Sequence, residues 1–175
     1  MACCPQSQVQ GVVEAGVGVV DALDPRTADE ATMVVLNRIY TRTGDDGTTG
    51  LYYGGRVPKS SDPIEVNGAV DEAQAMLGWA RSLTERGSRL NKMLVSLERD
   101  LWVLMAEVAT LPENRHKLTP GQSLVTEKMI RHLEDLIDEL SEETPMPTEF
   151  VVPGENQLAA ALDVARTVIR RAERD

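Results

Sequence analysis

The stretch VNGAVDEAQAMLGWARSL, residues 66–83, decides the class of the fold. Its apolar side chains recur every three or four residues, so they lie on one stripe of a helix. The stripe consists of Val66, Ala69, Val70, Ala73, Met76, Leu77, Ala80 and Leu83. Outward from this stretch, the same spacing predicts three further helices, over residues 90–108, 124–140 and 157–175.

The connections between these predicted helices are short and rich in Pro, Gly or Ser. Short connections favour antiparallel neighbours around one core. The sequence therefore predicts an all-α fold, an up-and-down helical bundle with a glycine-rich N-terminal loop. The chain of 175 residues has room for one domain, which we expect at residues 34–175. Residues 1–33 lack aromatic side chains and strong helical periodicity, so we expect a poorly ordered extension there.

Charge and cysteine content exclude several classes of protein. The formal net charge is −10, which disfavours general binding to nucleic acid or to an anionic membrane. No apolar run is long enough to span a bilayer. The only cysteines, Cys3 and Cys4, are adjacent and can neither staple a core nor chelate a metal as a spaced pair. We therefore expect a cytoplasmic protein.

The segment YTRTGDDGTTGLYYGGRVPK, residues 40–59, allows two interpretations. Residues 39–53 can form a hairpin of two short strands around an Asp-Gly turn. Alternatively, the backbone around Gly44, Gly47 and Gly50 directs its N–H groups at a polyphosphate. Hydroxyl donors and cations in the segment fit the second interpretation: Thr41, Thr43, Thr48, Thr49, Arg42 and Lys59. Asp45 and Asp46 would repel a phosphate, so we expect them to fix the turn or to act through Mg²⁺ and water.

Basic residues line one face of the last predicted helix. Arg166, Arg170 and Arg174 are spaced by four, with Asp163 and Arg171 nearby. One interpretation is a solvated, ion-paired surface. The other is a row of guanidinium groups that meets phosphates or an acidic residue of a partner subunit, because Arg donors grip oxyanions in pairs.

Two acidic residues, Asp71 and Glu72, lie inside the first predicted helix, next to the core positions Val70 and Ala73. They belong either to an ordinary polar face or to a partly buried site that needs a cation, for which Arg166 is a candidate. His116 and His132 are expected to be exposed, and the sequence shows no metal-ligand cluster and no nucleophile-and-base pair.

Five blocks, taken together, resemble the PduO-type ATP:cob(I)alamin adenosyltransferases, also called corrinoid adenosyltransferases. The blocks occur in the family's order between Leu36 and the C-terminus: YTRTGDDGTTGL, GGRVPKSSDP, GAVDEAQAMLGWAR, TEFVVPG and AALDVARTVIRRAER. The resemblance implies a bundle of normally five helices, ferritin-like in form, that assembles as a homotrimer with ATP between subunits. It also implies transfer of the 5′-deoxyadenosyl group of ATP to cob(I)alamin, with Mg²⁺, giving adenosylcobalamin and triphosphate.

The resemblance assigns roles to individual residues. Arg166 is expected to pair with Asp71 across a subunit interface, and the ring of Phe150 to displace the lower ligand of cobalamin. Without the resemblance, the residues around Phe150 predict a loop that anchors this ring in the bundle. The expected ATP ligands are Thr41, Arg42, Thr43, Gly44, Asp45, Gly47, Thr48, Thr49, Lys59, Glu72, Arg170 and Arg171. A flavin reductase and an adenosylcobalamin-dependent mutase or dehydratase are the expected partners.

Several positions depart from the family's pattern. Gln74 replaces an Asn, Glu155 replaces a Gly, and Asp163 replaces a His. Family members generally continue into a further helix beyond the block that ends this chain at Asp175, so we expect exposed apolar helix faces. These departures motivate an alternative function, a non-catalytic ATP or corrinoid binding or carrier protein, and a third, a purely structural helical module.

Overall fold

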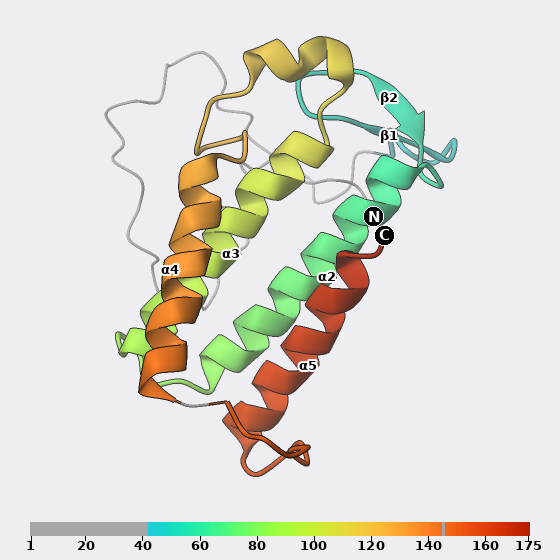
Figure 1. The fold of residues 1–175 in the computed structure, drawn as a ribbon. Helices are drawn as coiled ribbons and strands as arrows, with labels where there is room; N and C mark the ends of the chain where they lie inside the picture. Colours follow the sequence, from blue (N-terminus) through green and yellow to red (C-terminus); the bar gives the residue numbers. More distant parts are fainter. Residues whose placement is uncertain (1–41, 145) are drawn as a thin grey trace.

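The computed structural model describes residues 42–144 and 146–175. The predicted extension at residues 1–33 and the candidate ATP ligand Thr41 lie outside these residues. The described part contains a small hairpin followed by helices (Figure 1). In chain order the elements are β1 Thr48–Gly50, β2 Arg56–Pro58, α2 Asp62–Ser82, α3 Arg89–Val108, the 3₁₀ helix η2 Pro112–Lys117, α4 Glu127–Glu143 and α5 Gln157–Ala172.

Helix α2 is the centre of the bundle, with α3 and α5 packed against it. Helix α5 runs antiparallel to α2 along its length (Figure 1). Small side chains lie where these helices meet, and this allows the helix backbones to approach closely. The buried cluster consists of Leu77, Ala80, Leu94, Ala161 and Ala165. The prediction of an all-α bundle from apolar spacing is confirmed.

Side-chain caps fix the start of two helices. The Ser88 hydroxyl accepts a hydrogen bond from the Asn91 N–H at the start of α3, and the Asn156 side chain accepts one from the Ala159 N–H at the start of α5. Such caps satisfy donors that have no partner within the helix. The position of the first turn of α5 is therefore fixed by a local contact.

Helix α4 begins later than the apolar spacing predicts. Residues 124–125 were expected to be helical, yet the helix starts at Glu127. The Val125 N–H donates to the Glu107 carboxylate at 2.8 Å, and Leu124 forms an isolated bridge with Pro120. The Leu124 carbonyl oxygen accepts a hydrogen bond from the Gly121 N–H at 2.8 Å, so it is not free to accept the first hydrogen bond of a helix, and the chain stays in a turn here.

The apolar stripe of α4 is exposed. None of the residues of α4 is buried, and its large apolar side chains stand out from the helix: Ile130, Leu133, Ile137 and Leu140. Salt bridges from Arg89 to Glu139 and Glu143 connect the far end of α4 to the start of α3. The expectation of an exposed apolar helix face is met here. None of the helices in the described part of the chain has the length and apolar character that a membrane crossing needs.

The close approach of α2 and α5 can be tested by adding volume to it. Ala80 is fully buried, so we expect Ala80→Leu to lower the free energy of unfolding by about 1–3 kcal/mol through overpacking. Ala75 lies on the same helix but is exposed, and Ala75→Leu serves as the matched control, with a change of about 0.5 kcal/mol or less. Denaturant titration measures both values. Equal effects of the two substitutions would contradict the packing described.

Candidate functional site

The glycine-rich segment folds as a hairpin, but not around the Asp-Gly turn. Strand β1 pairs with β2 in antiparallel register, with Thr48 opposite Pro58 and Gly50 opposite Arg56. The connection therefore runs through residues 51–55. Here Tyr53, Gly54 and Gly55 have positive φ values of 60°, 98° and 93°. The prediction placed the turn seven residues too early, because two glycines in the left-handed region fit the connection better than Asp-Gly does.

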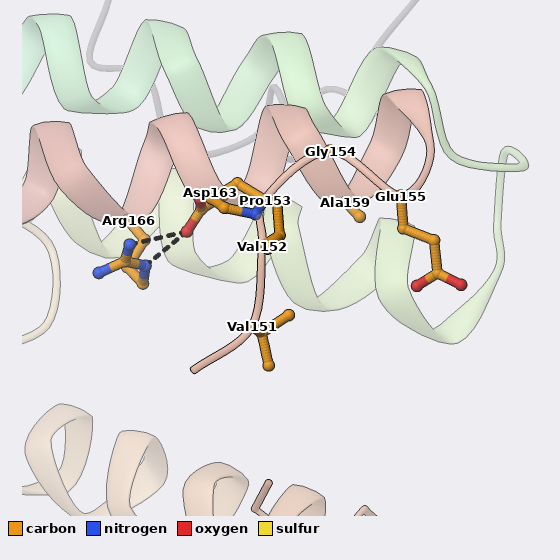
Figure 2. A pocket seen from close by; sticks show the side chains of 8 residues that line it. All are labelled: Val151, Val152, Pro153, Gly154, Glu155, Ala159, Asp163 and Arg166. Atoms are coloured by element: carbon orange, nitrogen blue, oxygen red, sulfur yellow. Dashed lines mark hydrogen bonds and ion pairs between the residues drawn. The ribbon is translucent and has the colours of Figure 1, made fainter. Parts of the chain in front are cut away.

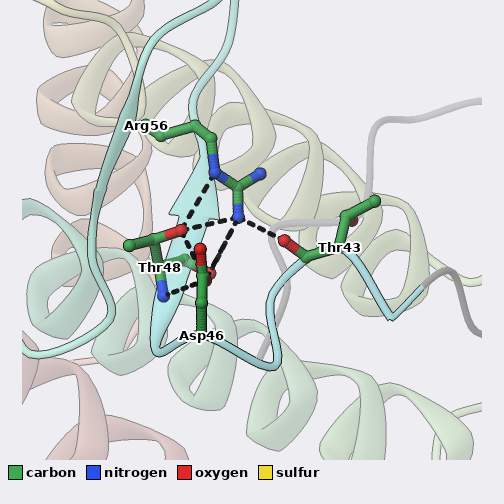
Figure 3. Close-up of polar contacts among 4 residues, drawn as sticks. All are labelled: Thr43, Asp46, Thr48 and Arg56. Carbon is green, nitrogen blue, oxygen red and sulfur yellow. Dashed lines mark hydrogen bonds and ion pairs between the residues drawn. The ribbon is translucent and has the colours of Figure 1, made fainter.

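Asp46 fixes the preceding turn instead of standing free in solvent. Its Oδ1 atom accepts hydrogen bonds from the Thr48 N–H at 2.9 Å and from the Thr48 hydroxyl at 2.7 Å (Figure 3). These hydrogen bonds, the hydroxyl first, together with the charge of Arg56, lower the pKa of Asp46 below its usual value. Of the two functions expected for Asp46, the structure supports fixing the turn, while Asp45 is exposed.

Arg56 is a residue that sequence reasoning missed. From β2 its Nε and Nη2 atoms donate to the Thr48 hydroxyl at 2.9 and 2.7 Å, and Nη2 also donates to the Thr43 carbonyl oxygen (Figure 3). The Asp46 carboxylate lies 3.7 Å from Nη2. A single exposed arginine in a short strand gives no sequence signal. The one available cue was its position opposite the glycine-rich loop in the hairpin register.

The predicted hydroxyl donors of the loop face different surroundings. Thr49 is only 4% exposed, and the Thr48 hydroxyl is engaged by Asp46 and Arg56. Arg42 and Thr43 are exposed, and Arg42 has a positive φ of 58°. The loop therefore presents backbone and cationic groups to solvent more than it presents hydroxyls.

Lys59 and Gly44 lie in direct contact. A Cβ atom placed on Gly44 would be 3.3 Å from the Lys59 Nζ and 2.9 Å from the Thr48 carbonyl oxygen. The Lys59 N–H donates to the Gly47 carbonyl oxygen at 2.9 Å, which holds the residue beside the loop. The absence of a side chain at Gly44 thus leaves room for an exposed ammonium group over the loop backbone. An ammonium over exposed backbone suits an oxyanion.

Helix α5 presents its basic residues in three different environments. Arg171 forms an ion pair with Glu72 that joins α5 to α2. Arg166 bonds to Asp163 one turn away on its own helix, at 2.8 Å from Nε and 2.7 Å from Nη2. Arg170 is exposed, and its side chain forms no hydrogen bond or ion pair with the described residues. Of these three residues, Arg170 is therefore the one available to an anion, while Arg174 donates from Nη1 to the Arg170 carbonyl oxygen at 2.7 Å.

The acidic pair of α2 is exposed. Partial burial of at least one of Asp71 and Glu72 was one of the two predictions, and it is wrong, because both residues are exposed. Glu72 instead reaches Arg171 at the surface. Arg166 is paired with Asp163 within this chain, so its pairing with Asp71 of a second subunit stays a prediction.

A pocket of about 250 Å³ lies between the segment that precedes α5 and the first turns of that helix. Asp163 and Arg166 face each other at its edge, while the Glu155 carboxylate points away from this pair (Figure 2). The lining of the pocket is apolar at residues 151–153 and charged at three positions, and it consists of Val151, Val152, Pro153, Gly154, Glu155, Ala159, Asp163 and Arg166. Glu155 and Asp163, both departures from the resemblance, therefore lie in one pocket.

Phe150 lies next to this pocket and is fully exposed, at 107% of its reference area. The prediction that the bundle anchors this ring is wrong for the chain described, because no helix covers residues 150–152, whose side chains are all exposed. A fully exposed aromatic ring is available to a flat apolar ligand. His116 and His132 are exposed, as expected. Among residues 42–144 and 146–175, no group of three His, Cys, Asp or Glu side chains could hold a metal ion.

Comparisons with known proteins agree with this arrangement. The family model described as cobalamin adenosyltransferase matches residues 39–175. A corrinoid adenosyltransferase of Citrobacter freundii is 42% identical over 139 residues, which cover 79% of this chain and 77% of the relative. One of Mycobacterium tuberculosis is 39% identical over 141 residues, covering 81% and 72%.

Solved structures show the same similarity. A variant PduO-type ATP:corrinoid adenosyltransferase from Lactobacillus reuteri, complexed with cobalamin and ATP, superposes with a TM-score of 0.68 at 30% identity. The superposition covers 78% of this chain and 75% of that chain. A second variant of the same enzyme, complexed with ATP, gives a TM-score of 0.66 at 31% identity.

The space over Gly44 can be tested with a single methyl group. We expect Gly44→Ala to displace Lys59 or the Thr48 carbonyl and to weaken ATP binding about tenfold, or about 1.4 kcal/mol. Gly50→Ala is the matched control, since a Cβ there would meet only the Gly55 carbonyl oxygen at 4.0 Å. Calorimetric titration with ATP measures both. Equal affinity in the two variants would show that the Gly44–Lys59 contact does not form part of the ATP site.

Proposed function

The chain belongs to the cobalamin adenosyltransferase family, and we propose how its residues divide the work of that reaction. The protein is an ATP:corrinoid adenosyltransferase, which transfers the 5′-deoxyadenosyl group of ATP to cob(I)alamin. The observation that carries this conclusion is the family match over residues 39–175. It covers both the glycine-rich hairpin and the basic face of α5.

The chemistry requires little covalent help from the protein. The electron pair of Co(I) attacks the C5′ carbon of ATP, the cobalt–carbon bond forms, and the C5′–oxygen bond breaks with its electrons leaving on triphosphate. The cobalt is the nucleophile, so no side chain needs to act as one. The protein's contribution is to align the two substrates and to stabilise the charge that develops on the triphosphate.

The triphosphate is assigned to the loop from Thr43 to Thr49 and to Lys59. The exposed ammonium of Lys59 over Gly44 supports this assignment. The exposed guanidinium of Arg170, on the basic face of α5, is proposed as a further ATP ligand. Arg42, Glu72, Arg171 and, outside the described residues, Thr41 complete the proposed ATP ligands. Mg²⁺ enters with the phosphates, and Asp45 is the exposed carboxylate that can reach it through water.

The hairpin with Lys59 and the basic face of α5 are proposed to meet between chains of a homotrimer. Arg171 contacts α2 at Glu72, ten residues beyond the start of that helix. This corresponds to about 15 Å along the α2 axis, measured from the start of α2. A neighbouring chain can bring its α5 to the hairpin, and Asp71 would then be available to replace Asp163 as the partner of Arg166.

Cobalamin is assigned to the pocket beside α5 and to the exposed ring of Phe150. The apolar lining of residues 151–153 suits the face of the corrin ring, and Phe150 is proposed to displace the lower ligand of the cobalt. We place the reaction in the cytoplasm. A flavin reductase that supplies reduced cobalamin and a mutase or dehydratase that uses the product are the proposed partners.

The activity itself is measured by adding reduced cobalamin, ATP and Mg²⁺ and recording the conversion of the cob(I)alamin spectrum to that of adenosylcobalamin. We expect turnover that depends on both substrates. Saturable binding of ATP and cobalamin without product would favour the non-catalytic binding protein. Neither binding nor product in folded protein would favour a structural helical module.

Phe150 provides a test of the cobalamin side. We expect Phe150→Ala to lower turnover from Co(II) cobalamin with a reductant far more than turnover from pre-reduced Co(I), by about tenfold or more. The reason is that the ring is needed to remove the lower ligand before reduction, and not for the transfer itself. Met146→Ala, at an exposed residue of the same segment that does not line the pocket, is the control. Equal losses of turnover with Co(II) and with Co(I) cobalamin would show that Phe150 has a packing role only.

A further inference from the structure

We propose that Arg56 is the positioning residue of the phosphate loop: it holds Thr43, Asp46 and Thr48 in the shape that receives the triphosphate. This inference rests on the proposed function of the loop in ATP binding. It adds a residue that neither lies among the proposed ligands nor belongs to the loop itself, because Arg56 is on the opposite strand of the hairpin.

The contacts of Arg56 connect both ends of the turn. Its Nη2 atom donates to the carbonyl oxygen of Thr43, before the turn, and to the hydroxyl of Thr48, after it. Nε donates to the same hydroxyl at 2.9 Å. One planar guanidinium therefore bridges the two limbs of the loop (Figure 3). A lysine ammonium is a single point of donation on a flexible stem and does not reproduce this fork.

Asp46 and Arg56 together use all the hydrogen-bonding capacity of the Thr48 hydroxyl. It has one proton and two lone pairs. The proton is donated to Asp46 Oδ1 at 2.7 Å, and the oxygen accepts from both Nε and Nη2 of Arg56. The side chain of Thr48 consequently has one orientation, and it links the carboxylate of Asp46 to the guanidinium.

The positive charge of Arg56 also changes the electrostatics of the loop. A carboxylate and a carbonyl oxygen in a loop that binds a polyanion repel the ligand unless a cation faces them. Arg56 faces both the Asp46 carboxylate and the Thr43 carbonyl. With those acceptors turned toward Arg56, the side of the loop near Gly44 and Lys59 can present N–H groups and positive charge.

The test compares Arg56→Ala and Arg56→Lys with Arg86→Ala. The control removes the same charge from an exposed position beyond the other end of α2. We expect Arg56→Ala to raise the Kd and the KM for ATP about tenfold or more. The kcat at saturating ATP and the KM for cobalamin should stay within about twofold, because the loop acts on ATP binding. Arg56→Lys should restore only a small part of the affinity, and Arg86→Ala should match the wild type.

A double substitution separates positioning from direct contact. If Arg56 acts through Thr48, then Arg56→Ala combined with Thr48→Val should bind ATP no more weakly than the more affected single variant. Effects that multiply would mean independent contacts with ATP and would overturn the inference, as would full rescue by Arg56→Lys or unchanged affinity in Arg56→Ala. If the wild type itself fails to bind ATP, it is the proposed function that falls.

Discussion

The close approach of α2 and α5 is the contact on which the rest of the structure depends. Alanines on the two helices, including Ala80, Ala161 and Ala165, are almost completely buried and leave no room for larger side chains. With the helices fixed this way, the exposed surface of α5 carries Arg166 and Arg170, Arg171 reaches Glu72 of α2, and the hairpin lies at the start of α2. A small-residue contact thus determines where the charges of the site lie.

The hairpin, in contrast, is stabilised by polar contacts. Arg56, Thr48 and Asp46 satisfy one another at the surface, and each contact on its own contributes little to stability in water. Together these contacts fix one conformation of the loop before a ligand binds, which reduces the conformational entropy lost on binding. The helical core supplies the stability, and the polar hairpin supplies the geometry for the phosphates.

The sequence predicts the helices well, because apolar spacing reports directly on the buried face. It fails where turn hydrogen bonds override spacing: the Leu124 carbonyl oxygen accepts from the Gly121 N–H, and α4 starts only at Glu127. Arg56 lies within the block GGRVPKSSDP, but its importance could not be predicted from that block, since it comes from the register of β1 and β2. The exposure of Phe150 could not be predicted from the sequence pattern either, because an aromatic side chain in a loop is buried only where another segment covers it.

The central claim is that the hairpin of one chain and the basic face of α5 of another form one ATP site. The direct measurement is the activity of mixed assemblies, purified with two tags, that contain one chain with Lys59→Ala and one with Arg170→Ala. Each variant alone should be nearly inactive. In each purified mixed trimer, about one site in three should combine an intact hairpin with an intact α5, and activity should return in that proportion. Mixed assemblies no more active than the two separate variants would show that each chain builds its site alone.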